Sequence, residues 1–389
     1  MEIFLEDQIM KRIGFIGYGL RSETMMQAFR TLEAPITVAA IADPRLEEIR
    51  EKVSGDPYFR NTVYYTDGEE MLEKEALDGV FIGTRCGLHT YYACKVLERN
   101  IPLFLEKPVS ITREQYEQLR EAARGKEHRC VVSFPLRLSS IVLEMKRIVD
   151  SGALGKLTMV QAINNVPYGS VYYHSWYRDP ELTGGLFLQK TTHDIDYINF
   201  LTGERPVSVC AKTAKLHFKG DRPAGLHCPD CPEYRTCTES SFVVKNLLKE
   251  DVTGDACCFA RDTGNEDGAS AIFTTESGML ISYNQNFTVK KSAGRRGCRL
   301  IGTKGSVEFD FYTAEIRHDD YLSPQTITHK FTFPPGAHFG GDERLALDFL
   351  RVLDGEPAQS HLGAGLESAA ACLAAKEADQ KGCFVAIPY

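Results

Sequence analysis

A short glycine-rich segment near the N-terminus constrains the fold of this 389-residue chain more than any other feature. The sequence RIGFIGYGLRS spans residues 12–22 and places Gly17 and Gly19 directly after an apolar run. Gly17 permits the tight turn that ends a strand, and Gly19 leaves space beside the backbone where a helix begins. Ser22 takes the third small position, where helix and strand pack closely. The segment therefore predicts a strand, a tight turn and a helix.

Short apolar, β-branched runs alternate with helical patterns as far as residue 133. The runs cover residues 13–16, 37–42, 63–65, 79–83, 103–105 and 130–133. Such alternation predicts a parallel sheet with crossover helices. Thr112 and Gln115 have the spacing of a capping box and predict one helix start. We expect a doubly wound domain over residues 1–135.

The second half of the chain carries longer alternating segments, which favour a mainly antiparallel sheet. They cover residues 157–166, 269–273, 279–287 and 298–301, with helical patterns over 140–149 and 341–381. The predicted fold class is α/β: an N-terminal Rossmann domain with a doubly wound parallel sheet, then a C-terminal α/β domain with a large, mainly antiparallel open sheet. We expect the second domain to span residues 136–389 and to include the helices over 341–381.

Composition narrows the class of partner. The chain has 53 acidic and 45 basic residues without long runs of either, for a formal net charge of -8. This balance provides no basic surface for nucleic acid or an anionic membrane, so we expect a small-molecule partner. The N-terminus lacks the pattern of a signal peptide and no window is apolar enough to span a membrane, so we expect a cytoplasmic protein. Most of the 12 cysteines stand alone in apolar contexts, as reduced thiols do.

The glycine turn and the end of the second run predict a dinucleotide site. Asp43 lies 26 residues after Gly17, where a carboxylate can accept the hydroxyls of an adenosine ribose and repel a 2'-phosphate. We therefore expect NAD, while Arg45 leaves NADP open. A helix cap is the alternative role for Asp43, and the two roles can coexist. The expected cofactor-binding residues of these two segments are Gly17, Tyr18, Gly19, Leu20, Arg21, Asp43 and Arg45.

Two further segments follow the fourth and fifth runs and reach the same edge of the predicted sheet, where ligands bind in such folds. They are GTRCGLH, residues 83–89, and FLEKP, residues 104–108. Thr84, His89, Glu106 and Lys107 are the cofactor candidates here. Lys107 can also hydrogen-bond a substrate hydroxyl and, partly desolvated, take part in proton transfer. A solvated loop lysine is the alternative.

These segments, in this order and spacing, resemble the Gfo/Idh/MocA family, named for glucose-fructose oxidoreductase and inositol dehydrogenase. The resemblance continues through Arg137 after the sixth run and three later segments. Those segments are WYRDPELTGG at 176–185, HDID at 193–196 and GGDE at 340–343. The resemblance implies a Rossmann domain that binds NAD(P) and a second domain that holds substrate and commonly forms the oligomer contact. It also implies hydride transfer at a sugar or cyclic polyol carbon. By this resemblance Lys107 and His193 are the catalytic residues.

One position departs from the family pattern. The family usually has an aspartate four residues before the histidine, and this chain has Gln189, followed by Lys190. On a helix Gln189, His193 and Asp196 share one face. A neutral amide cannot take a proton, so Asp196 or Lys107 would have to tune His193. Lys190 either binds an anionic or carbonyl-bearing substrate or pairs with Asp194.

Aromatic residues crowd the segment 168–177, which contains the only tryptophan. Rings with polar tips suit a sugar face, but they equally suit the covering of a sheet. The expected substrate-binding residues are Lys190, Gln189, Arg137, Tyr168, Trp176 and Asp196.

Three cysteines have metal-ligand spacing within an apparent insertion near residues 217–258. Cys228, Cys231 and Cys237 form the pattern CxxC followed by a third cysteine. With a fourth ligand from His227, His217, Cys257 or Cys258 they could hold a structural zinc or, less readily, a 4Fe-4S cluster. A reduced cluster without metal is the form we expect.

The function predicted from the sequence is an NAD(P)-dependent oxidoreductase acting on a hydroxyl-bearing carbon of a sugar, sugar acid or cyclitol. One alternative is a glycosidase or lyase that oxidises a sugar transiently and retains its cofactor. The other is a regulatory protein that binds NAD and sugar without turnover. We expect a homo-oligomer, a dimer or a tetramer.

Overall fold

The computed structural model describes residues 10–169, 171–250, 252–333 and 338–389. The chain divides into two compact units. Unit 1 contains Met1–Ser139 and Gly336–Leu366, and unit 2 contains Ser140–Pro335 and Glu367–Tyr389. The expected boundary after residue 135 is therefore close to the observed one. The single crossing between domains was wrong, because the chain returns to unit 1 near its end.

Unit 1 is built on a six-stranded, wholly parallel sheet with the order β3-β2-β1-β4-β5-β6. Each strand matches a predicted apolar run to within two residues. The strands are β1 (Lys11–Ile16), β2 (Ile36–Ala42), β3 (Val63–Tyr65), β4 (Gly79–Ile82), β5 (Leu103–Leu105) and β6 (Cys130–Val132). The helices are α1 (Leu20–Thr31), α2 (Leu46–Lys52), α3 (Gly68–Lys74), α4 (His89–Glu98), α5 (Arg113–Ala123) and α11 (Gly341–Leu353). The predicted cap is present, since the Thr112 side chain accepts a hydrogen bond from Gln115 N.

Helix α11 corrects the domain prediction, which had placed residues 341–381 wholly in the second domain. Phe349 of α11 packs against Phe104 and Phe29, with ring centroids 5.7 Å and 6.4 Å apart. These residues belong to the core of unit 1, together with Leu345. An amphipathic helix that buries its apolar face there stabilises unit 1, wherever it stands in the sequence.

Unit 2 contains a nine-stranded sheet with the order β14-β13-β12-β11-β7-β10-β9-β8-β15. Only β7 and β10 pair in parallel among these strands, so the sheet is mainly antiparallel as predicted. The strands are β7 (Leu157–Asn165), β8 (Pro206–Ala214), β9 (Gly268–Thr275), β10 (Leu280–Asn286), β11 (Arg295–Gly302), β12 (Gly305–Asp310), β13 (Glu315–Asp320), β14 (Thr326–Lys330) and β15 (Val385–Ala386).

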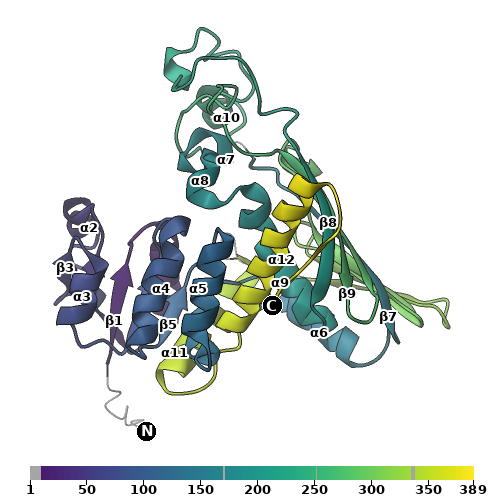
Figure 1. Cartoon of the computed structure of the whole chain (residues 1–389), viewed down its shortest axis with the longest axis horizontal. Helices are drawn as coiled ribbons and strands as arrows, with labels where there is room; N and C mark the ends of the chain where they lie inside the picture. Colours follow the sequence, from purple (N-terminus) through teal and green to yellow (C-terminus); the bar gives the residue numbers. More distant parts are fainter. Residues whose placement is uncertain (1–9, 170, 251, 334–337) are drawn as a thin grey trace. The chain divides into compact units, whose positions relative to one another are not determined.

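Helices α6 and α9 and the later part of α12 lie along one face of this sheet (Figure 1). Their bounds, with those of the shorter helices, are α6 (Ser140–Asp150), α7 (Val171–His174), α8 (Pro180–Thr183), α9 (Leu186–Thr202), α10 (Ser241–Asn246) and α12 (Leu362–Lys381). The half-buried Glu266 carboxylate accepts a hydrogen bond from Phe187 N at the start of α9. A negative charge at this end of a helix is stabilising. The cysteine-rich segment lies between β8 and β9 and contains α10.

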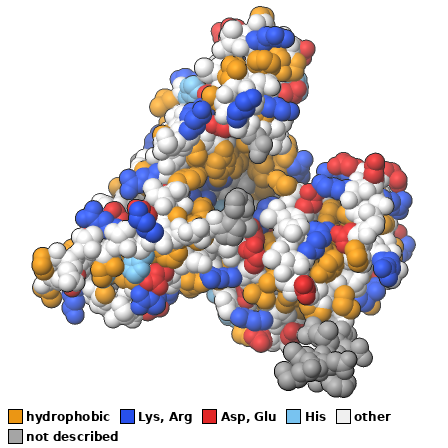
Figure 2. Space-filling model, turned by 180° about the vertical axis from the view of Figure 1, so that it is seen from behind, with side chains coloured by type: hydrophobic (Ala, Val, Ile, Leu, Met, Phe, Trp, Pro, Cys, Tyr) orange, Lys and Arg blue, Asp and Glu red, His pale blue; other side chains and the backbone are white. Residues whose placement is uncertain are grey.

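The surface agrees with the mixed charge of the sequence. Basic and acidic side chains are interspersed over the face shown in Figure 2. Within the described ranges, no helix combines the length and apolar character needed to span a membrane.

Candidate active site

The turn between β1 and α1 has the geometry that a dinucleotide phosphate group requires. Gly17 has φ +81°, and a Cβ there would lie 2.8 Å from Gly83 C and Thr84 N. Ser22 is fully buried, and its hydroxyl donates to the Gly17 carbonyl at 2.8 Å, so the serine braces the turn. A Cβ on Gly19 would meet no atom within 4 Å. Gly19 caps α1 without a side-chain hydrogen bond, so the helix N-terminus faces open space, as an anion site does.

Asp43, which directly follows β2, is held in place by hydrogen bonds. Its carboxylate accepts hydrogen bonds from Tyr18 N at 2.9 Å and from Arg45 N at 2.9 Å. The Arg45 guanidinium contacts the same carboxylate at 3.1 Å. Burial would raise the pKa of Asp43, but these hydrogen bonds outweigh it and hold the pKa below its ordinary value. The carboxylate is therefore charged and held against the glycine turn.

Two neighbouring residues of the predicted cofactor set differ in how far their side chains are buried. The Tyr18 ring is buried in the core of unit 1 and packs edge-on against Phe15 and Phe59, so only its backbone can face a cofactor. Leu20, by contrast, is 78% exposed at the first turn of α1.

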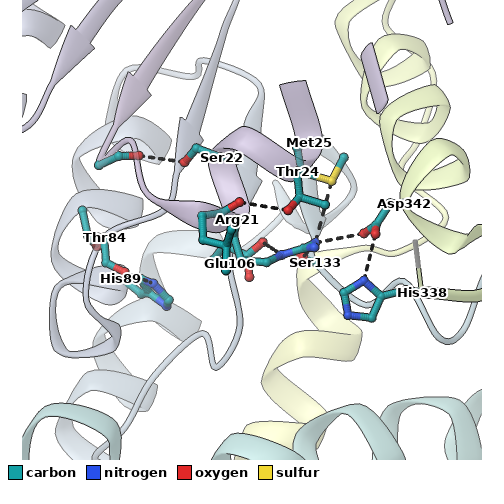
Figure 3. Close-up of polar contacts among 12 residues, drawn as sticks. Arg21, Ser22, Thr24, Met25, Thr84, His89, Glu106, Ser133, His338 and Asp342 are labelled. Carbon is teal, nitrogen blue, oxygen red and sulfur yellow. Dashed lines mark hydrogen bonds and ion pairs between the residues drawn. The ribbon is translucent and has the colours of Figure 1, made fainter. Parts of the chain in front are cut away.

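Arg21 contacts side chains from distant parts of the sequence of unit 1, as Figure 3 shows. Its guanidinium contacts Glu106 Oε1 at 3.1 Å, Asp342 Oδ1 at 3.0 Å and the Ser133 hydroxyl at 3.0 Å. His338 Nδ1 lies 2.8 Å from the other oxygen of Asp342. Burial opposes ionisation of Asp342, yet the His338 hydrogen bond and the Arg21 charge lower its pKa to about 2. Arg21 and Glu106 therefore form an ion pair with each other. The sequence did not predict Asp342 as a second partner of Arg21.

His89 links the two loops that follow β4 and β5. Its Nδ1 lies 2.8 Å from the Pro108 carbonyl and its Nε2 3.2 Å from the Thr84 carbonyl. The ring is 1% exposed, and burial lowers its pKa, so it is neutral and can donate only one of these hydrogen bonds. His89 thereby fixes Thr84 beside the segment that carries Lys107. Lys107 itself is half-buried and joined to Pro108 by a cis peptide bond.

Arg137 is buried in unit 1 and donates to the Gln359 carbonyl at 3.2 Å. This contact ties the end of the β6 segment to the segment before α12. Its predicted role in substrate binding stays a prediction.

In unit 2, Lys190 is a buried cation among tyrosines. Its Nζ lies 3.2 Å from the Tyr168 hydroxyl, 4.8 Å from the centre of the Tyr168 ring and 4.5 Å from that of Tyr172. The residue is 7% exposed, and burial, aided by the charge of Arg296, lowers its pKa below the ordinary value. No described carboxylate lies within ion-pair distance of this ammonium. The expected alternative, a pair with Asp194, was therefore wrong.

Asp194 belongs to a buried network that the sequence did not reveal. Its carboxylate accepts from Arg296 Nε at 2.8 Å, the Tyr283 hydroxyl at 2.8 Å and Asn164 Nδ2 at 2.7 Å. These partners come from β11, β10 and β7, which are neighbours in the sheet. The network anchors α9 to the sheet at the level of Lys190 and His193. Arg296 stands opposite Asn164 in the β7–β11 register, and this pairing is known only from the structure, so no sequence signal pointed to the network.

The other predicted residues of α9 are buried along with nearly the whole helix. Gln189 donates its amide to the Thr183 carbonyl at 2.7 Å, so this side chain secures the start of α9. His193 is 7% exposed and Asp196 1% exposed. Trp176 stacks on Tyr177 with ring centroids 3.9 Å apart. The roles of these four residues toward substrate stay predictions.

The three cysteines with metal-ligand spacing lie around one cavity of unit 2. Cys228, Cys231 and Cys237 line one cavity together with Cys257 and Cys258. Yet among the described residues no three Cys, His, Asp or Glu side chains are gathered as one metal ion requires. His227 and His217, considered as fourth ligands, face Asp255 and Glu239 instead.

Comparison with known proteins gives a family match in each of the two units. Residues 11–134 match the model of an oxidoreductase family with an NAD-binding Rossmann fold, and residues 142–308 match the GFO/IDH/MocA C-terminal domain. The chain belongs to the Gfo/Idh/MocA family. It is accordingly an NAD-binding oxidoreductase, and the open glycine turn beside Asp43 fits such a nucleotide.

Members of this family resemble the chain over different lengths. The Bacillus subtilis protein YteT is 27% identical over 417 residues, which cover 95% of each chain. The inositol 2-dehydrogenase of Pseudarthrobacter chlorophenolicus is 28% identical over 225 residues, 56% of this chain and 61% of that protein. The solved structure of levoglucosan dehydrogenase with NADH and levoglucosan has the same fold, with a TM-score of 0.76 and 18% identity. That match covers 97% of this chain and 100% of the other.

Proposed function

We propose that this protein transfers hydride between NAD and a hydroxyl-bearing carbon of a sugar, sugar acid or cyclitol. Relatives named inositol 2-dehydrogenase and the fold of levoglucosan dehydrogenase support this class of substrate. Asp43 supports NAD over NADP, because its charged carboxylate suits ribose hydroxyls and repels a 2'-phosphate.

The observation that carries the proposal is the environment of Lys190. A buried ammonium without a carboxylate partner is costly unless a ligand supplies electron-rich oxygens. The tyrosine rings around it offer a partly apolar face with hydroxyl tips, which suits a polyol ring. Lys190 is therefore assigned to a hydroxyl, carbonyl or carboxylate of the substrate, and Tyr168 to the substrate's ring face.

Lys107 and His193 are proposed as the residues that handle the proton. When bound, NAD accepts the hydride from the substrate carbon. The hydroxyl on that carbon must lose its proton as the hydride leaves, and a lysine or histidine in hydrogen-bond reach can take it. Gln189 cannot serve here, because its amide has no proton-accepting site of suitable basicity and is held by Thr183.

Absorbance of NADH tests the proposal directly. The purified chain is mixed with NAD and with myo-inositol, scyllo-inositol, glucose, levoglucosan, gluconate or glucuronate, and NADH formation is followed. We expect at least one compound to give turnover that depends on NAD. Lack of turnover with every compound, from a protein shown to bind NADH, would contradict the proposal.

The assembly of the protein is also a proposal. We propose a homo-oligomer, because the broad sheet of unit 2 leaves apolar side chains such as Ile272 and Ile327 about half exposed, whereas the cytoplasmic location stays a prediction from the sequence. Light scattering of the purified chain checks this: a dimer or tetramer supports it, and a monomer contradicts it.

A further inference from the structure

The positive charge of Lys190 is not balanced by its neighbours in unit 2. Two nearby charged groups act on its ammonium, Arg296 and Asp194, and they form an ion pair with each other at 2.8 Å. The Asp194 carboxylate also accepts hydrogen bonds from Tyr283 and Asn164. Because Arg296 balances Asp194, the charge of Lys190 is left over within the part of unit 2 that the structure describes.

The hydrogen bonding of this ammonium is incomplete as well. An ammonium has three N–H donors, and the Tyr168 hydroxyl accepts one at 3.2 Å. In the described ranges of the chain, no second acceptor lies within hydrogen-bond distance of Lys190 Nζ. The rings of Tyr168 and Tyr172 attract a cation only through their π faces. The lowered pKa of Lys190 agrees with a charge that its present surroundings disfavour, and a bound anion would remove that cost.

A series of contacts leads from this buried charge to the surface of unit 2. Tyr168, which contacts Lys190 Nζ, is 38% exposed. Tyr312 follows β12, is 42% exposed, and is hydrogen-bonded to the Tyr168 hydroxyl. A phenolic hydroxyl can rotate and donate to a different acceptor. Tyr312 can therefore turn its O–H toward a ligand that reaches the ammonium.

The unbalanced charge selects a class of ligand. A hydroxyl or carbonyl of a neutral sugar would accept an N–H of Lys190 but would bring no negative charge. A carboxylate brings one negative charge, and its two oxygens accept several charge-assisted hydrogen bonds. A phosphate group carries about 1.5 to 2 negative charges at pH 7, which is more than one ammonium balances. The tyrosine rings suit the C–H face of a sugar.

We propose, building on the hydride transfer proposed above, that Lys190 and the Tyr312 hydroxyl bind the carboxylate of a sugar acid. Tyr168 holds the ammonium in position and presents its ring to the sugar. The hydride leaves from a different, hydroxyl-bearing carbon of the same molecule, because a carboxylate carbon carries no hydrogen. The substrate is thus an aldonate or a uronate, and neutral sugars and cyclitols are poorer ligands.

Matched pairs of ligands test this assignment on the unaltered full-length chain. The protein is saturated with NADH, so that no ligand is oxidised, and binding is measured by calorimetry. Glucuronate, galacturonate and gluconate are each compared with the corresponding amide, which has nearly the same shape without the charge. We expect at least one acid to bind about tenfold more tightly than its amide. Equal binding within every pair, or no binding of any acid, would overturn the proposal. Tighter binding of glucose 6-phosphate than of every acid would overturn the choice of a carboxylate.

Variants locate the carboxylate. Lys190→Met should bind acid and amide within about twofold of each other, whereas the exposed-site control Lys245→Met should keep the preference for the acid. Tyr312→Phe should weaken binding of the acid about threefold or more. A preference that survives in Lys190→Met would overturn the role of Lys190, and unchanged affinity in Tyr312→Phe would remove Tyr312 from the site. NADH binding and thermal unfolding report the folding of each variant, and the comparison on the unaltered chain does not depend on it.

Calorimetry and NADH formation together separate this inference from the function on which it rests. An acid that binds tightly but gives no NADH with NAD would contradict the proposed reaction and leave the carboxylate site in place. Formation of NADH from a neutral sugar, with every acid bound no better than its amide, would support the reaction and overturn the carboxylate site.

Discussion

The two glycines of the β1–α1 turn should respond in opposite ways to the same added methyl group. Gly17→Ala forces a side chain into a backbone with φ +81°, which costs ~1–2 kcal/mol. The new Cβ would also lie 2.8 Å from Gly83 C and Thr84 N, and such crowding costs ~1–3 kcal/mol. Together these give about 2–5 kcal/mol of lost stability. For a unit of this size, that corresponds to a fall of roughly 5–15 °C in Tm.

Gly19→Ala is the matched control for stability. Gly19 has φ -102° and ψ -167°, which alanine adopts freely, and its Cβ would meet no protein atom within 4 Å. Without nucleotide its Tm should equal or slightly exceed that of wild type, because alanine lowers the entropy of the unfolded chain by an amount worth ~0.4–1 kcal/mol. Its methyl group would occupy the space assigned to the pyrophosphate, so NADH should bind at least tenfold more weakly, ~1.4 kcal/mol.

Thermal unfolding with and without NADH measures both effects in one assay. At 100 times its Kd a ligand stabilises by ~2.7 kcal/mol, and a tenfold weaker ligand at the same concentration by ~1.4 kcal/mol. Gly19→Ala should therefore show about half the NADH-induced stabilisation of wild type. Unfolding of Gly17→Ala at the wild-type temperature would contradict the strain assigned to Gly17, and NADH binding by Gly19→Ala as tight as in wild type would contradict the phosphate site assigned to Gly19.

Two further predictions concern the ion pairs of unit 1 and the buried lysine of unit 2. Arg21→Met should destabilise the protein by about 2–4 kcal/mol, because it leaves the carboxylates of Glu106 and Asp342 buried without their cation. The depressed pKa of Asp342 contributes about 2 kcal/mol above pH 4 that is lost as pH falls from 4 to 2. Asp342→Asn should therefore flatten the loss of stability in this pH range, as measured by urea unfolding. An unchanged acid profile would contradict the assignment. Lys190→Met should raise the substrate KM at least tenfold (~1.4 kcal/mol) and leave NADH affinity within twofold of wild type, whereas the exposed Lys245→Met should change neither. Because burial lowers the pKa of Lys190, substrate affinity in the wild type should decline on the alkaline side below pH 10.5. An unaltered KM in Lys190→Met would refute its assignment to substrate.

The parallel sheet could be predicted because its evidence is local. Strands buried on both faces read as apolar runs, and the order of glycine turn, Asp43 and the later loops fixes where they end. The strands of unit 2 were harder to identify. Strand β13, EIRHDD, carries charges along much of its length and is recognised only through its pairing with β12 and β14. Helix α11 was assigned to the wrong unit for a similar reason. An amphipathic pattern shows that a helix packs on a hydrophobic core, but it does not show which core.

In the candidate site, too, contacts within one motif could be predicted and contacts between distant segments could not. Gly17, Asp43 and Ser22 have contacts that follow from their own motif. The partners of Asp194 stand far from it in sequence and meet only through the register of β7, β10 and β11. The placement of Cys257 beside Cys228 likewise depends on a pairing between distant segments. Sequence spacing could not predict these contacts, because it contains no information on which strands are neighbours.

The transfer of deuterium from NADH to a substrate carbon is the decisive test of the proposed reaction. NADH deuterated at nicotinamide C4 is incubated with the protein and with inosose, fructose or ketogluconate, and each product is analysed by mass spectrometry. If the protein transfers hydride to a sugar or cyclitol carbon, one product carries a single deuterium on the former carbonyl carbon. If the label stays on the nucleotide with every probe, although the protein binds NADH, the proposed reaction is wrong.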